Sequence, residues 1–118
     1  MMAGRSFADR VSSRRLASGQ LAVLTNPHAP TVTIAGTLRA GPAFAVDGRF
    51  SVPGLTAAML DRGTTALGRM ELARELEDHG LQLAVRASAA TPTIVSFSAQ
   101  GLAEELPRLV RLTVAVLR

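Results

Sequence analysis

Residues 54–64 read Gly-Leu-Thr-Ala-Ala-Met-Leu-Asp-Arg-Gly-Thr, and this stretch decides how the rest of the chain is interpreted. Pro53 suits the first turn of a helix, and Gly63 suits the left-handed position that ends one. The stretch therefore predicts a short apolar helix. From residue 49 to residue 70 there is no histidine, glutamate or cysteine, so this helix lacks the side chains that hold most zinc sites.

Hydrophobic periodicity predicts strands and helices on both sides of this segment. Val32, Ile34 and Leu38 alternate with polar residues, which is typical of a strand with one buried face. We expect this strand to form a hairpin with the strand before it. The order ββααββα indicates an α+β fold, with helices packed on one face of a largely antiparallel sheet. The expected elements are strands at 20–26 and 31–40, helices at 54–62 and 69–79, strands at 81–87 and 93–100, and a helix from 107 to the chain end.

Each helix is expected to bury one apolar side, as amphipathic helices do. No stop signal follows Val116, so we expect the chain to be truncated within its last helix. The apolar sides of the helices comprise Leu55, Ala58 and Met59 in the first, Leu72, Ala73 and Leu76 in the second, and Leu109, Val110, Thr113, Val116 and Leu117 in the last. In the strand at 93–100, Val95, Phe97 and Ala99 are expected on one face and Ile94, Ser96 and Ser98 on the other.

The charge of this 118-residue chain is unevenly distributed. All 13 basic residues are arginines, and the net charge is +4. Residues 1–15 hold four of these arginines and one aspartate, so an Arg/Ser-rich tail accounts for most of the net charge. There is no Tyr or Trp to stack on bases. A solvated basic tail explains the charge better than a nucleic-acid surface does, although a nucleic-acid binder remains a third hypothesis.

The sequence does not determine the cellular compartment of the protein. No apolar run reaches the roughly 20 residues that a membrane span needs, and the arginines at the start are not followed by the apolar region of a secretory signal. Cysteine is absent, so the redox compartment stays undecided between cytoplasm and periplasm.

Several short motifs occur along the chain in a fixed order and spacing. They are Arg15-Leu-Ala-Ser-Gly-Gln-Leu-Ala-Val-Leu24, Pro30-Thr-Val32, Leu38-Arg-Ala-Gly41, Gly54-Leu55, Met59-Leu60, Gly63-Thr64, Glu71-Leu-Ala73, Leu76-Glu-Asp-His-Gly80 and Leu106-Pro107. Together they resemble the pitrilysin/insulinase family of inverzincin zinc peptidases, which includes mitochondrial processing peptidase. The resemblance implies that residues 16–118 are the N-terminal portion of a peptidase domain of the LuxS/peptidase type.

The resemblance fails at the catalytic positions. Active members read H-x-x-E-H before the Gly-Thr pair, with two zinc-binding histidines and a glutamate that activates water. Counting back from Gly63, the three positions fall on Gly54, Ala57 and Ala58. None of these residues can bind a metal or accept a proton. We therefore expect no catalytic, cofactor-binding or metal-binding residue in this chain, with zinc only in a catalytic partner domain or subunit.

Other polar residues have ordinary structural explanations. His28 lies between prolines in a turn, and His79 precedes Gly80 at the negative end of a helix, where a capping role is expected. Acidic residues on the wet side of a helix or at a helix start need no catalytic role. Ser96 and Ser98 lack the Gly-x-Ser-x-Gly elbow of a nucleophile. The acidic residues to which this structural explanation applies are Glu75, Glu77, Asp78, Glu104 and Glu105.

The resemblance implies a non-catalytic part of a bacterial-type zinc metallopeptidase, which forms a chamber wall around unfolded peptide and supports a homologous catalytic domain or subunit. An exposed sheet edge near 31–40 could accept peptide as an added strand. The alternative is a stand-alone assembly subunit without a peptidase role, similar to the core proteins of the respiratory cytochrome bc complex. We expect the isolated segment to self-associate through an exposed apolar helix face.

Overall fold

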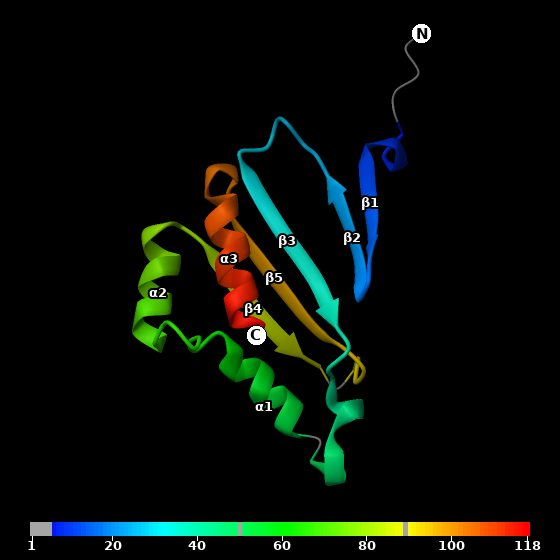
Figure 1. The fold of residues 1–118 in the computed structure, drawn as a ribbon, viewed down its shortest axis with the longest axis vertical. Coiled ribbons are helices and arrows are strands. Elements are labelled where there is room, and N and C mark those ends of the chain that lie inside the picture. The colour runs from blue at the N-terminus through cyan, green and yellow to red at the C-terminus, as the bar shows by residue number, and fades with distance from the viewer. Residues whose placement is uncertain (1–5, 50, 89) are drawn as a thin grey trace. The chain divides into compact units, whose positions relative to one another are not determined.

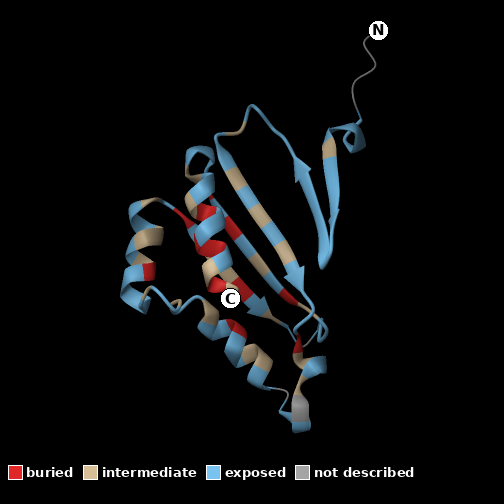
Figure 2. Cartoon of the chain, in the orientation of Figure 1, coloured by how far each residue is buried: buried red, intermediate tan, exposed pale blue. Residues whose placement is uncertain are grey.

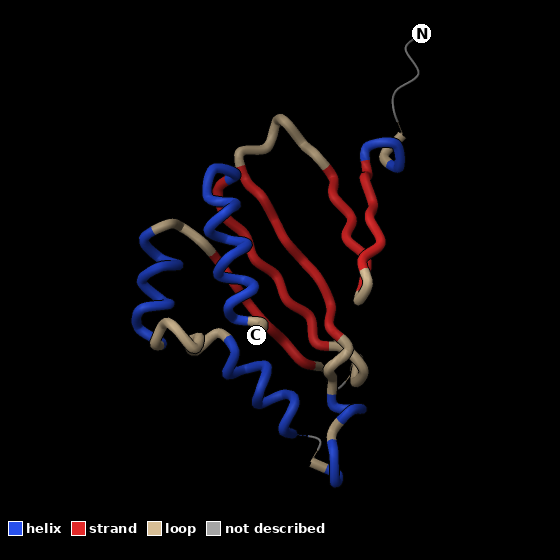
Figure 3. The backbone as a smooth tube through the Cα atoms, in the orientation of Figure 1, coloured by secondary structure: helices blue, strands red, loops and turns tan. Residues whose placement is uncertain are grey.

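The computed structural model describes residues 6–49, 51–88 and 90–118. The chain divides into two compact units, Met1–Pro30 and Thr31–Arg118, and each is described by itself. Figure 3 shows the helices, strands and loops of both units along the chain. Residues 1–5 of the expected tail lie outside the described residues.

The first unit is a two-stranded antiparallel hairpin. β1 (Val11–Leu16) pairs with β2 (Gly19–Leu24), and only Ala17 and Ser18 join the two strands. Residues 11–15, which we expected within the tail, thus form most of β1. Serines and arginines fill the middle of this strand and lie exposed on both of its faces. Because neither face is buried, the sequence shows no apolar alternation by which to recognise the strand.

The hairpin that we expected between residues 20–26 and 31–40 would join strands from the two separate units. Among the described residues, β2 pairs with β1, and β3 (Thr31–Leu38) pairs with β5 (Val95–Leu102). Each unit is described by itself, so the hairpin between residues 20–26 and 31–40 stays a prediction. A two-residue connection is the commonest length for a hairpin turn, and β1 and β2 are joined in this way.

The second unit contains a three-stranded antiparallel sheet in the order β3-β5-β4, with β4 at Gln82–Ala87. Figure 1 shows β5 between its two neighbours. The register places Ile34 of β3, Ala99 of β5 and Leu83 of β4 side by side. The sheet therefore has one continuous apolar face, which requires an apolar covering layer.

The alternation expected for residues 93–100 is confirmed. Val95 and Ala99 are buried and Phe97 is half-buried, whereas the side chains between them are exposed. Gly36 lies opposite Phe97 in the register. A Cβ at this glycine would lie 2.5 Å from the Phe97 ring, so the absence of a side chain makes room for the aromatic group on the core face.

Three helices cover the apolar face of the second unit: α1 (Ser51–Leu60), α2 (Arg69–Asp78) and α3 (Leu106–Val116). Figure 2 shows that buried residues concentrate where α3 lies over the sheet. Leu72 of α2 and Leu109 of α3 are the largest fully buried side chains. The expected α+β class, with antiparallel sheets and packed helices, is confirmed, and the observed order has one more strand, βββααββα. No helix among the described residues is long and apolar enough to cross a membrane.

The buried side of α3 is rotated slightly from the expected one. Leu109, Thr113 and Val116 are buried as expected, but Val110 is 44% exposed and Leu112 is buried instead. The four buried positions follow the spacing i, i+3, i+4, i+7 of a single helix face. Val110 does not belong to that spacing, so its inclusion in the buried side was wrong.

Candidate functional site

The candidate site lies along α1, whose two ends are set by local backbone chemistry. Pro53 lies in the first turn, where its missing N–H costs no helical hydrogen bond. Beyond the helix, Gly63 has φ of 148°, a value that favours glycine. Thr64 Oγ1 accepts a hydrogen bond of 2.9 Å from the backbone N–H of Leu67. These contacts fix the position at which α1 stops and the direction in which the chain leaves it.

The buried side of α1 is not the expected one. Ala57 is 2% exposed, whereas Leu55 is 66% exposed and Met59 58% exposed, and Ala58 is exposed as well. The expectation that Leu55, Ala58 and Met59 face the core is wrong. Apolar residues of α1 lie on all sides of the helix, so the sequence of α1 does not define which side is buried. The small residues Gly54 and Ala58 face β4. Of the large apolar residues, Val52, Leu55 and Met59 are exposed, whereas Leu60 is half-buried and packs against the core.

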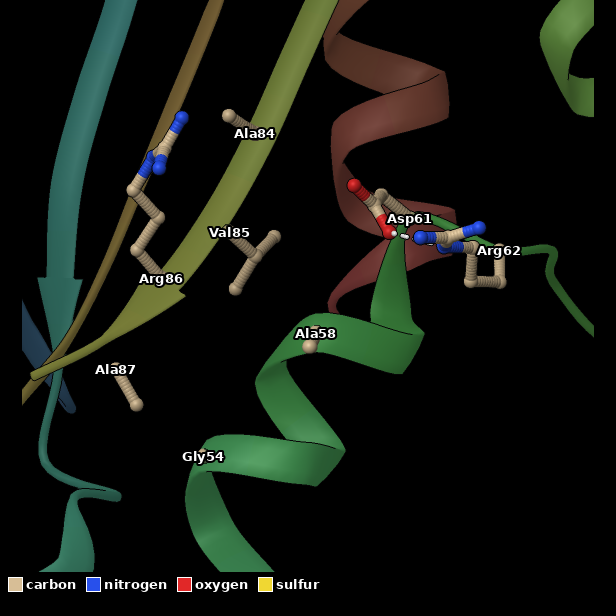
Figure 4. Close-up of a pocket in the computed structure, with 8 residues that line it drawn as sticks. All are labelled: Gly54, Ala58, Asp61, Arg62, Ala84, Val85, Arg86 and Ala87. Carbon is tan, nitrogen blue, oxygen red and sulfur yellow. Dashed lines mark ion pairs between the residues drawn. The ribbon is translucent and has the colours of Figure 1, made fainter.

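A groove of about 350 Å³ separates part of α1 from β4. In Figure 4, Gly54 and Ala58 lie on the α1 side, and Val85 and Ala87 lie on the side of β4 that faces the helix. A Cβ built at Gly54 would meet no atom within 4 Å. The groove exists because glycine and alanine occupy the helix positions nearest the strand. Its full lining is Gly54, Ala58, Asp61, Arg62, Ala84, Val85, Arg86 and Ala87.

The residues of this groove do not fit the zinc ion that the pitrilysin resemblance implies. The three positions matched to H-x-x-E-H are Gly54, Ala57 and Ala58, and their side chains carry no ligand atom. Asp61 is the one carboxylate in the lining, and its Oδ1 lies 3.5 Å from Nε of Arg62. Nowhere in residues 6–49, 51–88 and 90–118 do three His, Cys, Asp or Glu side chains gather into a metal site. Metal-assisted hydrolysis therefore has no support from these side chains.

The strand that borders the groove is an edge strand of its sheet. Within the described part of the second unit, β4 pairs with β5 on one side only. An edge strand presents unpaired backbone N–H and C=O groups that can pair with another extended chain. Sequence analysis pointed to residues 31–40 as such an edge. β3 is also at an edge of this sheet, but the groove lies beside β4.

Arg86 is the residue of this site that sequence analysis missed. Its side chain is exposed and points away from α1 in Figure 4, on the face of the sheet opposite the helices. The ion pairs of the described residues include Arg62 and Arg108 but not Arg86. No sequence signal marked it, because an arginine in an alternating strand is an ordinary exposed residue until the strand order is known.

The acidic residues considered as catalytic candidates are engaged elsewhere or dispersed. Arg108 of α3 donates from Nη1 to Glu75 Oε2 at 2.8 Å and from Nε to Glu105 Oε2 at 3.1 Å. His79 Nδ1 lies 3.4 Å from Glu105 Oε1, just beyond the end of α2. This cluster joins α2 to the start of α3, away from the groove lining. Glu77, Asp78 and Glu104 are exposed.

The remaining candidates have structural roles. His28 is exposed in its turn, where its backbone N–H donates to Asn26 Oδ1 at 3.3 Å. His79 occupies the C-cap of α2, as expected. Ser96 Oγ donates to the carbonyl oxygen of Arg86 at 3.4 Å, and Ser98 is exposed on the same face.

Comparison with known proteins places this arrangement in a fold. No protein-family profile matches the sequence, and no curated protein sequence matches it. Among solved structures, the fold is similar to the inactive domain of an M16 peptidase from Pseudomonas fluorescens, with a TM-score of 0.77 and 19% identity over 91% of this chain. It is also similar to the ferredoxin protease FusC, solved as a mutant in complex with Arabidopsis ferredoxin, with a TM-score of 0.76 and 18% identity over 92% of this chain.

These similarities define the class of fold, which is that of the M16 peptidases, the designation given to the pitrilysin/insulinase type. The chain spans 26% of the length of the Pseudomonas fluorescens domain and 12% of FusC. It therefore corresponds to a fraction of those proteins, and the inactivity of the one and the proteolytic activity and ferredoxin partner of the other are properties of those proteins.

Proposed function

We propose that this chain is a non-catalytic, pitrilysin-like part of a zinc metallopeptidase, which holds an extended peptide while a homologous catalytic domain or subunit cuts it. The observation that carries the proposal is the groove between α1 and β4. It lies where the resemblance expects two histidines and a glutamate, and Gly54, Ala57 and Ala58 occupy those positions. A helix that carries no metal ligands and borders an open groove beside a strand edge is suited to binding a peptide rather than to cutting it.

The geometry of the groove supports an extended polypeptide as its occupant. A chain added alongside β4 would use the unpaired backbone groups of that edge. Its side chains would alternate between the helix-facing side and the opposite side of the sheet. The helix-facing side chains would enter the space beside Gly54 and Ala58. Backbone pairing tolerates many sequences, which suits a surface that contacts unfolded substrates.

Both similar structures support the class of function at the level of the family. One is named as an inactive peptidase domain and the other as a protease bound to a protein. An inactive member of the same fold is the kind of protein that this proposal describes. The resemblance leads us to expect a zinc ion and a catalytic partner. An assay of peptide cleavage should therefore contain a homologous catalytic domain or subunit loaded with zinc.

The proposal is tested by binding without cleavage. The 118-residue chain is titrated into a fluorescein-labelled nonapeptide of alternating threonine and valine, and anisotropy reports binding. We expect saturable binding that Ala58→Phe weakens at least tenfold, because the phenyl ring fills the groove. Leu55→Phe, on the exposed side of the same helix, is the matched control and should bind as the unmodified chain does. Equal binding by both variants, or no binding by the unmodified chain, would contradict the proposal.

The same peptide-binding assay distinguishes the proposed function from the alternative one. A stand-alone assembly subunit without a peptidase role has no need for the groove, so a chain that binds no peptide but associates with another folded protein would favour that reading.

A further inference from the structure

The residues of the groove and of β4 indicate which peptide sequence would bind there best. This inference rests on the proposed function. We propose that the edge of β4 prefers an extended segment with the pattern apolar–acidic–apolar. The pattern follows from three consecutive residues of the strand, Val85, Arg86 and Ala87, and from what each of them faces.

The acidic preference comes from Arg86. In an antiparallel pair, residues directly opposite each other project to the same face of the sheet. A peptide residue opposite Arg86 would therefore share the face away from α1, where the guanidinium is exposed. Arg86 forms no ion pair with the described acidic residues. Its cross-strand neighbour on β5 is the uncharged Ser96, so an incoming carboxylate opposite Arg86 would meet one positive charge.

The apolar preference comes from the neighbouring positions. Peptide residues on either side of the acidic one would face α1, opposite Val85 and Ala87. Those two side chains, together with Gly54 and Ala58, form the apolar part of the groove. Its volume of about 350 Å³ leaves space for aliphatic side chains. Asp61 and Arg62 lie 3.5 Å apart and partly neutralise each other, so the lining as a whole keeps one excess positive charge.

The test compares labelled nonapeptides that differ only at their centre, Val-Glu-Val, Val-Gln-Val and Val-Lys-Val, bound to the unmodified chain at low salt. A cross-strand pair of opposite charges contributes only a small interaction energy. We therefore expect the Val-Glu-Val peptide to bind about threefold more tightly than Val-Gln-Val and about tenfold more tightly than Val-Lys-Val. A Gly-Glu-Gly centre should bind about tenfold more weakly than Val-Glu-Val, because it leaves the groove unfilled.

Two substitutions assign the preference to one side chain. Arg86→Glu should reverse the order of the three peptides, and Arg86→Gln should abolish the preference, which keeps the test decisive if the charge reversal impairs folding. Arg111→Glu makes the same change of charge on the exposed side of α3 and should leave the order unchanged. Added salt should shrink the preference for Glu.

The outcomes distinguish this inference from the proposed function. If all peptides bind equally and Ala58→Phe weakens every one, the groove binds peptide and the preference is wrong. If no peptide binds, the proposed function fails and this inference fails with it. If Arg111→Glu alters the order as much as Arg86→Glu, the net charge of the chain causes the effect, and the assignment to β4 is overturned.

Discussion

α1 and α3 lie on the same face of one sheet, yet they contribute differently to the molecule. α3 buries Leu109, Leu112 and Val116, whereas α1 buries only Ala57 and leaves most of its large apolar side chains exposed. Burial of large aliphatic side chains is the main source of stability in a small domain. The difference indicates that α3 holds the sheet and its helices together, and that α1 shapes a groove beside β4.

The largest loss of folding stability is expected from truncating a buried side chain of α3. Leu109 is 0% exposed, so Leu109→Ala removes buried methyl groups and leaves a cavity, which costs about 3 kcal/mol. Leu55→Ala on α1, where the side chain is exposed, should change the free energy of unfolding by less than about 0.5 kcal/mol. Urea denaturation followed by circular dichroism measures both. Similar losses for the two variants would contradict the division of roles.

A second substitution examines how closely α1 approaches the strand. Ala57→Leu forces a large side chain into the contact between α1 and the sheet, and we expect a loss of about 2 kcal/mol from overpacking. Ala58→Leu, one residue along, places the same side chain in the groove and should leave thermal stability nearly unchanged. If the two variants unfold at the same temperature, α1 is rotated differently from the structure described above.

A smaller effect is expected at the junction of α2 and α3. Arg108→Ala removes hydrogen bonds to Glu75 and Glu105. These side chains are partly exposed, so we expect a loss of about 1 kcal/mol that decreases as salt is added. Arg111→Ala on the exposed side of α3 serves as the control. A salt-independent loss, or an equal loss in the control, would show that the ion pairs do not stabilise this junction.

Much of this fold could be predicted from local patterns. Residues 31–36 alternate between exposed and half-buried positions, residues 95–102 alternate between core-facing and exposed positions, and α2 starts at Arg69 as its periodicity indicated. These features depend on neighbours in the sequence. The pairing of β3 with β5 brings together residues 57 to 71 positions apart, and no local pattern encodes such a pairing.

The candidate site was predictable only in part. The resemblance located the three positions that lack ligand atoms, and the structure places two of them, Gly54 and Ala58, in the groove lining. The contribution of β4 could not be foreseen, because Val85 and Arg86 become relevant only once β4 is known to be an edge strand. The rotation of α1 was equally hidden, since alanine and glycine are compatible with either side of a helix.

The most direct test of the central claim is one titration of the labelled Val-Glu-Val peptide with the 118-residue chain, run with and without EDTA, and followed by mass spectrometry of the recovered peptide. We predict identical binding curves and an intact peptide, because Gly54, Ala57 and Ala58 supply neither metal ligands nor a proton acceptor. Loss of binding with the chelator, or chelator-sensitive cleavage of the peptide, would contradict the claim.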